Sequence, residues 1–112
     1  MSKPTTLRDA QNAVHQWISQ WEEGYFSPLS NLARLTEELG ELARAINHAH
    51  GDKPPKTGDT NAETDPIAEE IGDLLFVLIA LANSLEIDLS EALRDVLQKY
   101  DIRDAQRFTP GE

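Results

Sequence analysis

The sequence predicts an all-α protein, and three observations lead to that prediction. Apolar residues recur every three to four positions through four segments, which is the period of a helix that buries one face. Residue types that cap helix N-termini stand before these segments. No stretch alternates polar and apolar residues as a half-buried strand does. At 112 residues, we expect one domain over 1–112.

The four helices are expected at 6–21, 28–49, 66–86 and 88–102. Each has a start signal, and proline follows the cap in two of them. In order, the signals are Thr5 and Thr6, Ser27 with Pro28, Asp65 with Pro66, and Asp88 with Glu91 three residues later. Residues 51–65 are rich in proline and glycine and lack large apolar side chains, which predicts a flexible loop. A loose tail is expected at 104–112.

Composition excludes several classes of protein. The formal charge is −10, whereas affinity for nucleic acid comes from clustered Lys and Arg, so we expect no nucleic-acid partner. The chain has no cysteine, which excludes disulfides and thiolate metal sites. The longest uncharged apolar run is about half of a membrane span, and no secretory signal is visible. We therefore expect a soluble cytoplasmic protein with no membrane partner.

Two acidic clusters, "EELGE" and "EIGD", stand on the second and third expected helices. Residues three apart share a helix face, so Glu38 pairs with Glu41 and Glu70 pairs with Asp73. If the helices are antiparallel neighbours, all four carboxylates meet at the edge of the core. Carboxylates about 4 Å apart repel by roughly 4 kcal/mol at an effective dielectric near 20, so protons or cations must compensate. Hard oxygen ligands without Cys or His favour Mg²⁺ or Mn²⁺.

The alternative is that these acids are solvated faces of acidic helices, with Arg34 and Arg44 in surface ion pairs. Glutamate is a good helix former, so either cluster alone agrees with this alternative. The recurrence of the spacing on an apolar helix favours the metal site. A di-iron centre is disfavoured because no His has a Glu three residues before it.

Together the two clusters read as EExxE, a spacer of 28 residues, and ExxD. This pattern resembles the MazG-like nucleotide pyrophosphohydrolases of the all-α NTP pyrophosphatase superfamily. The resemblance covers about residues 7–107 and is greatest with the short single-domain members related to the bacterial YpjD group. It implies a four-helix MazG-like bundle that hydrolyses a nucleoside triphosphate to the monophosphate and pyrophosphate with Mg²⁺, for which Mn²⁺ can substitute. Members clear deoxynucleotides or damaged nucleotides from the pool, which is a house-cleaning role.

Residue by residue, the resemblance implies four metal ligands, namely Glu38, Glu41, Glu70 and Asp73. It also implies two catalytic residues. These are Glu38 and Glu37, and Glu37 is the candidate for orienting or deprotonating the attacking water. Spacing alone does not choose the phosphorus atom that is attacked.

Substrate contacts are expected at four positions. "KYDIR" resembles the family's K-aromatic-x-x-R pattern, so Lys99 and Arg103 are candidate phosphate contacts; alternatively, they only complement the helix dipole. Trp21 is a candidate for stacking on the base, whereas core packing is the alternative for both Trp17 and Trp21. Asn83 lies inside an apolar helix and needs a hydrogen-bond partner, which is either the substrate or another helix.

The third expected helix is apolar almost all round through "LLFVLIALA", as buried helices are. Four helices of one short chain can hardly enclose it, so we expect a homodimer, or a dimer of dimers, as in the resembled family. Two other functions stay open. One is dUTPase, dCTPase or phosphoribosyl-ATP pyrophosphohydrolase specificity, and the other is a non-catalytic helical dimer that binds a nucleotide or a partner.

Overall fold

The computed structural model describes residues 3–51 and 65–111, which form four α-helices and no strand. The helices are α1 (Leu7–Ser19), α2 (Pro28–His50), α3 (Pro66–Ser84) and α4 (Leu89–Asp104). The all-α prediction is therefore confirmed. Apart from its two end residues, the loop predicted at 51–65 lies outside the described residues.

The caps act as their residue types predict. In each helix the side chain of the N-cap residue accepts a hydrogen bond from a backbone N–H of the first turn, which satisfies an otherwise unpaired donor. The donor and cap pairs are Asp9 to Thr6, Ser30 to Ser27, Ile67 to Asp65, and Glu91 to Asp88.

Two helices end two residues earlier than predicted, and the backbone gives the reason. After Ser19, the N–H of Trp21 donates to the carbonyl of Ile18, a tighter turn that ends α1. After Ser84, Glu86 adopts φ 57°, and a left-handed residue cannot continue a right-handed helix. In contrast, α4 continues two residues beyond its predicted end.

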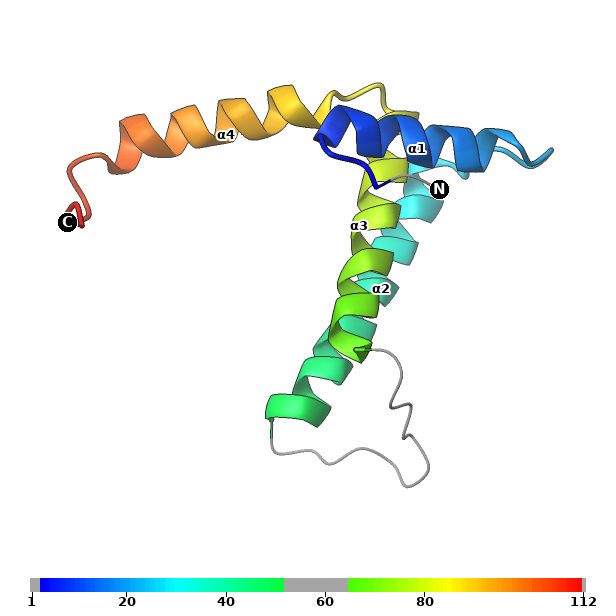
Figure 1. Cartoon of the computed structure of the whole chain (residues 1–112), viewed down its shortest axis with the longest axis horizontal. Coiled ribbons are helices and arrows are strands. Elements are labelled where there is room, and N and C mark those ends of the chain that lie inside the picture. The colour runs from blue at the N-terminus through cyan, green and yellow to red at the C-terminus, as the bar shows by residue number, and fades with distance from the viewer. Residues whose placement is uncertain (1–2, 52–64, 112) are drawn as a thin grey trace.

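Helices α2 and α3 form a long antiparallel hairpin, which Figure 1 shows as the upright part of the molecule. Helix α1 packs across α3 at one end of this hairpin. Helix α4 starts at the same end, contacts α1 and then leads away from the hairpin (Figure 1). Within one chain, the four helices thus form an open arrangement.

The buried core lies where α1 crosses α3, around Val14, Ile79 and Ala80. Much other apolar surface stays exposed. The helical period of the apolar residues in the second expected helix predicts one buried face, but Leu32, Leu39 and Ile46 of that face are exposed. Further exposed apolar side chains on α3 and α4 are Ile71, Leu75, Leu78, Leu93 and Leu97. No helix in residues 3–51 and 65–111 has the length and apolarity needed to cross a bilayer.

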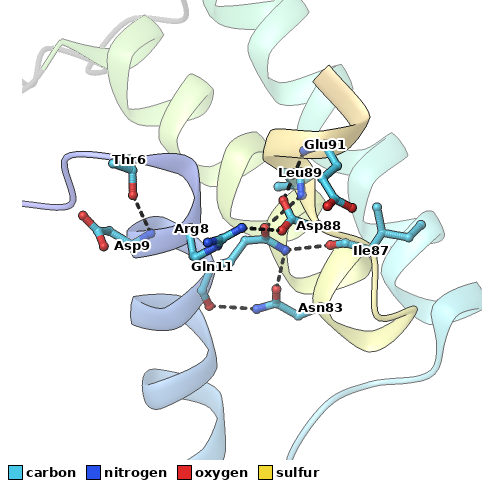
Figure 2. Close-up of polar contacts among 9 residues, drawn as sticks. All are labelled: Thr6, Arg8, Asp9, Gln11, Asn83, Ile87, Asp88, Leu89 and Glu91. Atoms are coloured by element: carbon cyan, nitrogen blue, oxygen red, sulfur yellow. Dashed lines mark hydrogen bonds and ion pairs between the residues drawn. The ribbon is translucent and has the colours of Figure 1, made fainter. Parts of the chain in front are cut away.

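A polar junction ties α1 to the end of α3 and the start of α4 (Figure 2). Gln11 is its centre, because its Nε2 donates to Asn83 Oδ1 at 2.9 Å and to the Ile87 carbonyl at 2.8 Å. Its Oε1 accepts from the Leu89 N–H at 2.9 Å, and Asn83 Nδ2 donates to the Gln11 carbonyl at 2.9 Å. These hydrogen bonds hold three helices at one corner.

Candidate active site

Three carboxylates from two helices meet on the α2–α3 hairpin. Glu38 of α2 and Glu70 and Asp73 of α3 each offer an oxygen, and these oxygens lie within 4.8 Å of one another. Glu70 and Asp73 are three residues apart, so they share the face of α3 that packs on α2. Glu38 and Glu70 are half-buried and Asp73 is exposed. We call Glu38, Glu70 and Asp73 the acidic triad.

The other two acids predicted on α2 lie outside the triad. The carboxylate of Glu41 accepts a hydrogen bond from Arg44 Nη2 at 2.6 Å. This is one of the surface ion pairs that the alternative interpretation foresees. Glu37 is exposed on α2. The predicted metal-binding role of Glu41 and the catalytic role of Glu37 stay predictions.

The triad concentrates negative charge where water is partly excluded. Burial raises the pKa of Glu70, and the nearby charges of Asp73, Glu38 and Glu41 raise it further. A bound cation would relieve the same repulsion. Carboxylate oxygens are the donors that hard divalent cations such as Mg²⁺ prefer, so the residues present suit such an ion.

A cavity of about 370 Å³ lies near the end of α1, and much of its lining is aromatic. The aromatic residues that line it are Trp17, Trp21, Tyr25, Phe26 and Phe76. The alternative that Trp17 and Trp21 pack in the core is wrong for this chain, because these residues are 47% and 52% exposed. Trp21 lies beyond the end of α1, and its ring meets that of Trp17 edge to face at 5.4 Å.

The triad and this cavity are consecutive sections of one face of the hairpin. On α2, the cavity residues Asn31 and Arg34 precede Glu38 by seven and four positions, which places all three on one face. On α3, the cavity residue Phe76 follows Asp73 by three positions. Because α2 and α3 are antiparallel, both helices lead from acids to cavity in the same direction. The distance along α2 from Glu38 to Arg34 is about 6 Å.

Asn83 forms interhelical bonds, which was one of the two interpretations of this residue. Besides its bonds with Gln11, its Nδ2 donates to the Tyr25 hydroxyl at 3.2 Å. The same hydroxyl shares a hydrogen bond with Nδ1 of His15. Asn83 thus supports the cavity through Tyr25 and is not among the residues that line the cavity. Its contact with substrate stays a prediction.

Lys99 and Arg103 both lie against the ring of Tyr100 on α4, at 5.3 and 4.9 Å from its centroid. Arg103 also pairs with Asp104 at 3.1 Å. Because α4 leads away from the hairpin, one chain does not bring these cations to its own triad (Figure 1).

Comparison with known proteins identifies the class as hydrolases that act on nucleotide pyrophosphate bonds. Residues 26–108 match the MazG nucleotide pyrophosphohydrolase domain, and the chain belongs to this family. The resemblance carried by the EExxE and ExxD clusters is therefore confirmed.

Relatives agree in sequence and in fold. The uncharacterised protein YpjD of Bacillus subtilis is 52% identical over 107 residues, which are 96% of this chain and 94% of YpjD. Its crystal structure superposes with a TM-score of 0.78 over 90% of this chain and 99% of that chain. A Bacillus-conserved MazG protein, described as a nucleotide pyrophosphohydrolase, has a TM-score of 0.76 at 47% identity, covering 95% and 100% of the two chains. Human dCTP pyrophosphatase 1 is 32% identical over 103 residues, which are 90% of this chain and 58% of that protein.

Proposed function

We propose that the protein hydrolyses a deoxynucleoside triphosphate, or a damaged nucleotide, to the monophosphate and pyrophosphate, with Mg²⁺ held by the acidic triad. Mn²⁺ is the expected substitute. The observation that supports this most is the continuity of the hairpin face, where the triad adjoins an aromatic cavity. The two ends of a nucleotide match these two parts of the face: its phosphates bind cations, as the triad would, and its flat base can stack on aromatic rings, as in the cavity.

The chain's own residues have separate tasks in this proposal. Glu38, Glu70 and Asp73 hold the cation, and Glu41 joins them by turning from Arg44. When bound, the ion neutralises charge and acts as a Lewis acid toward the phosphates. Glu37 orients the attacking water and accepts its proton, for which its exposed carboxylate is free to move.

The aromatic cavity is the proposed site of the base. A base that stacks on Trp21 covers an indole that is half exposed in the free protein. Stacking tolerates different bases, since each has an aromatic face. The residues at the cavity's edge, rather than the stacking ring, then decide which base is preferred.

A second copy of the chain completes the proposed site. Triphosphate brings negative charge to a protein with net charge −10, so phosphate contacts need cations besides the metal. Lys99 and Arg103 stand on α4, away from the triad of the same chain. In a homodimer that covers the exposed apolar residues of α3 and α4, these cations reach the triad of the other copy. The same reasoning allows a dimer of dimers.

The test is release of pyrophosphate from a panel of triphosphates, including dCTP, dUTP and phosphoribosyl-ATP, with Mg²⁺ and with EDTA. We expect turnover only with Mg²⁺, and at least a roughly hundredfold loss in Glu70→Gln and Asp73→Asn with the oligomer retained. Glu91→Gln on α4 is the matched control and keeps full activity. Absence of metal-dependent release from every triphosphate would overturn the proposal and favour a binding protein.

A further inference from the structure

Arg34 has an unusual environment among the arginines of this protein. The other five each lie within 3.6 Å of a carboxylate, and they are Arg8, Arg44, Arg94, Arg103 and Arg107. No carboxylate in residues 3–51 and 65–111 lies at ion-pair distance from Arg34. Its guanidinium lies over the ring of Phe26, 5.7 Å from the centroid. The guanidinium of Arg34 is thus held by an aromatic ring, which leaves its positive charge without a neutralising carboxylate.

The position of Arg34 is the junction between the two halves of the site. It lines the aromatic cavity and stands one helical turn before Glu38 of the triad. Side chains of a helix lean toward its N-terminus, so Arg34 leans from the triad toward the cavity. The next cavity residue on this face, Asn31, is 1% exposed, so Arg34 is the last charged group of α2 before the interior.

We propose that Arg34 binds the α-phosphate of the nucleotide and thereby sets the distance between the base and the hydrolysed bond. This inference rests on the proposed function, since it takes the nucleotide orientation from it. The α-phosphate is the phosphate attached to the nucleoside, so it follows directly on a base held in the cavity. A guanidinium that stacks on an aromatic face keeps its N–H edge free to donate two parallel hydrogen bonds to phosphate oxygens.

The charges around Arg34 agree with a phosphate ligand. Glu23, a carboxylate of the α1–α2 connection, also lines the cavity but forms no ion pair with Arg34. Glu38, one turn away, belongs to the triad and is taken by the cation in the proposed complex. Arg34 is then the one described positive side chain of the cavity lining that an incoming phosphate meets.

Hydrolysis leaves the α-phosphate on the monophosphate product, which gives a test that needs no turnover. The probes are the four common deoxynucleoside 5′-monophosphates and the matching nucleosides, titrated with Mg²⁺ present so that the acidic triad does not repel the phosphate. Fluorescence of Trp17 and Trp21 reports binding, because both indoles line the cavity. The readout is the ratio of the two affinities, because stacking of the base cancels from it.

We expect Arg34→Gln to lower this ratio about tenfold, the effect of losing a charge-assisted hydrogen bond at a half-exposed site. Arg34→Met is the second neutral variant, should glutamine disturb the helix. Arg94→Gln on α4 removes the same charge elsewhere and keeps the ratio. An unchanged ratio in both Arg34 variants, an equal fall in Arg94→Gln, or no binding of any monophosphate to the unsubstituted protein overturns the inference. Pyrophosphate release by the unsubstituted protein, measured separately with Mg²⁺, decides the proposed function.

Discussion

Replacing Asn83 with alanine tests the junction that holds α1, α3 and α4 together. The amide of Asn83 takes part in three hydrogen bonds in a half-buried position, and Figure 2 shows the two that it forms with Gln11. It accepts from Gln11 Nε2 at 2.9 Å and donates to the Gln11 carbonyl at 2.9 Å and to the Tyr25 hydroxyl at 3.2 Å. Alanine removes all three and leaves the helix backbone unchanged.

The expected loss of stability follows from these contacts. A hydrogen bond contributes about 1 kcal/mol net, so three contribute about 3 kcal/mol. Two effects reduce the loss, because alanine favours the helix by about 0.6 kcal/mol and half-buried partners regain water. Gln11 also keeps its bonds to Ile87 and Leu89. We therefore expect the free energy of unfolding to fall by about 2 kcal/mol and Tm by about 8 °C.

The assay is urea and thermal unfolding followed by circular dichroism. Asn12→Ala is the matched control, because Asn12 is exposed on α1 and its side chain forms no hydrogen bond with the described residues. Both variants are compared at one protein concentration, since self-association would make Tm depend on it. A difference below about 0.5 kcal/mol between the two variants would show that the junction does not stabilise the fold.

Two further predictions follow from the charged residues. Asp88 accepts a hydrogen bond from Arg8 at 3.0 Å, and this bond, with that from the Glu91 N–H, lowers the pKa of Asp88 (Figure 2). The stability that Asp88 adds is present above its ordinary pKa of 3.8 and is lost as the pH falls through the lower pKa of the folded state. Asp88→Ala should therefore lower Tm by several degrees at pH 7. The difference in Tm between this variant and the unsubstituted protein should become smaller in thermal unfolding at increasingly acid pH. A difference in Tm that stays constant with pH would contradict this prediction. If Lys99 acts on the other copy, mixing the inactive variants Glu70→Gln and Lys99→Gln, with subunit exchange, should restore pyrophosphate release, because every heterodimer then contains one intact site. Failure to recover activity after exchange, shown by tagged copies, would exclude the shared site.

Local signals explain why the helices could be predicted so closely. Each N-cap acts through a hydrogen bond inside its own first turn, so neighbouring residues contain the information. Helix ends were harder, because α3 stops where Glu86 takes a left-handed conformation that its residue type does not favour. The burial of α2 was also predicted wrongly. The spacing of its apolar residues, such as Leu39, indicates that one face is apolar but not which partner covers that face.

The candidate site was predictable where helical spacing alone brings groups together. Residues three apart on α3 and an antiparallel neighbour were sufficient to unite Glu70, Asp73 and Glu38. The aromatic cavity was not predictable in this way, because it forms where the α1–α2 connection folds back against both α2 and α3. The helix predicted at 6–21 included Trp21, and core packing was one interpretation of its side chain, yet α1 ends at Ser19. Arg34 was interpreted only as a partner in a surface ion pair, although it lines the cavity and precedes Glu38 by one turn, so its spacing could have indicated its place beside the triad.

The placement of the acidic triad and the aromatic cavity on different parts of the chain has a consequence for how enzymes of this family could diversify, if the proposed roles are taken as given. The acids belong to the middle of two regular helices, whereas several cavity residues belong to the irregular connection between α1 and α2. Connections accept sequence change more readily than packed helices do. Grafting residues 20–27 from a relative should therefore transfer the base preference that we propose for the cavity, while the proposed metal-binding acids of α2 and α3 stay unchanged.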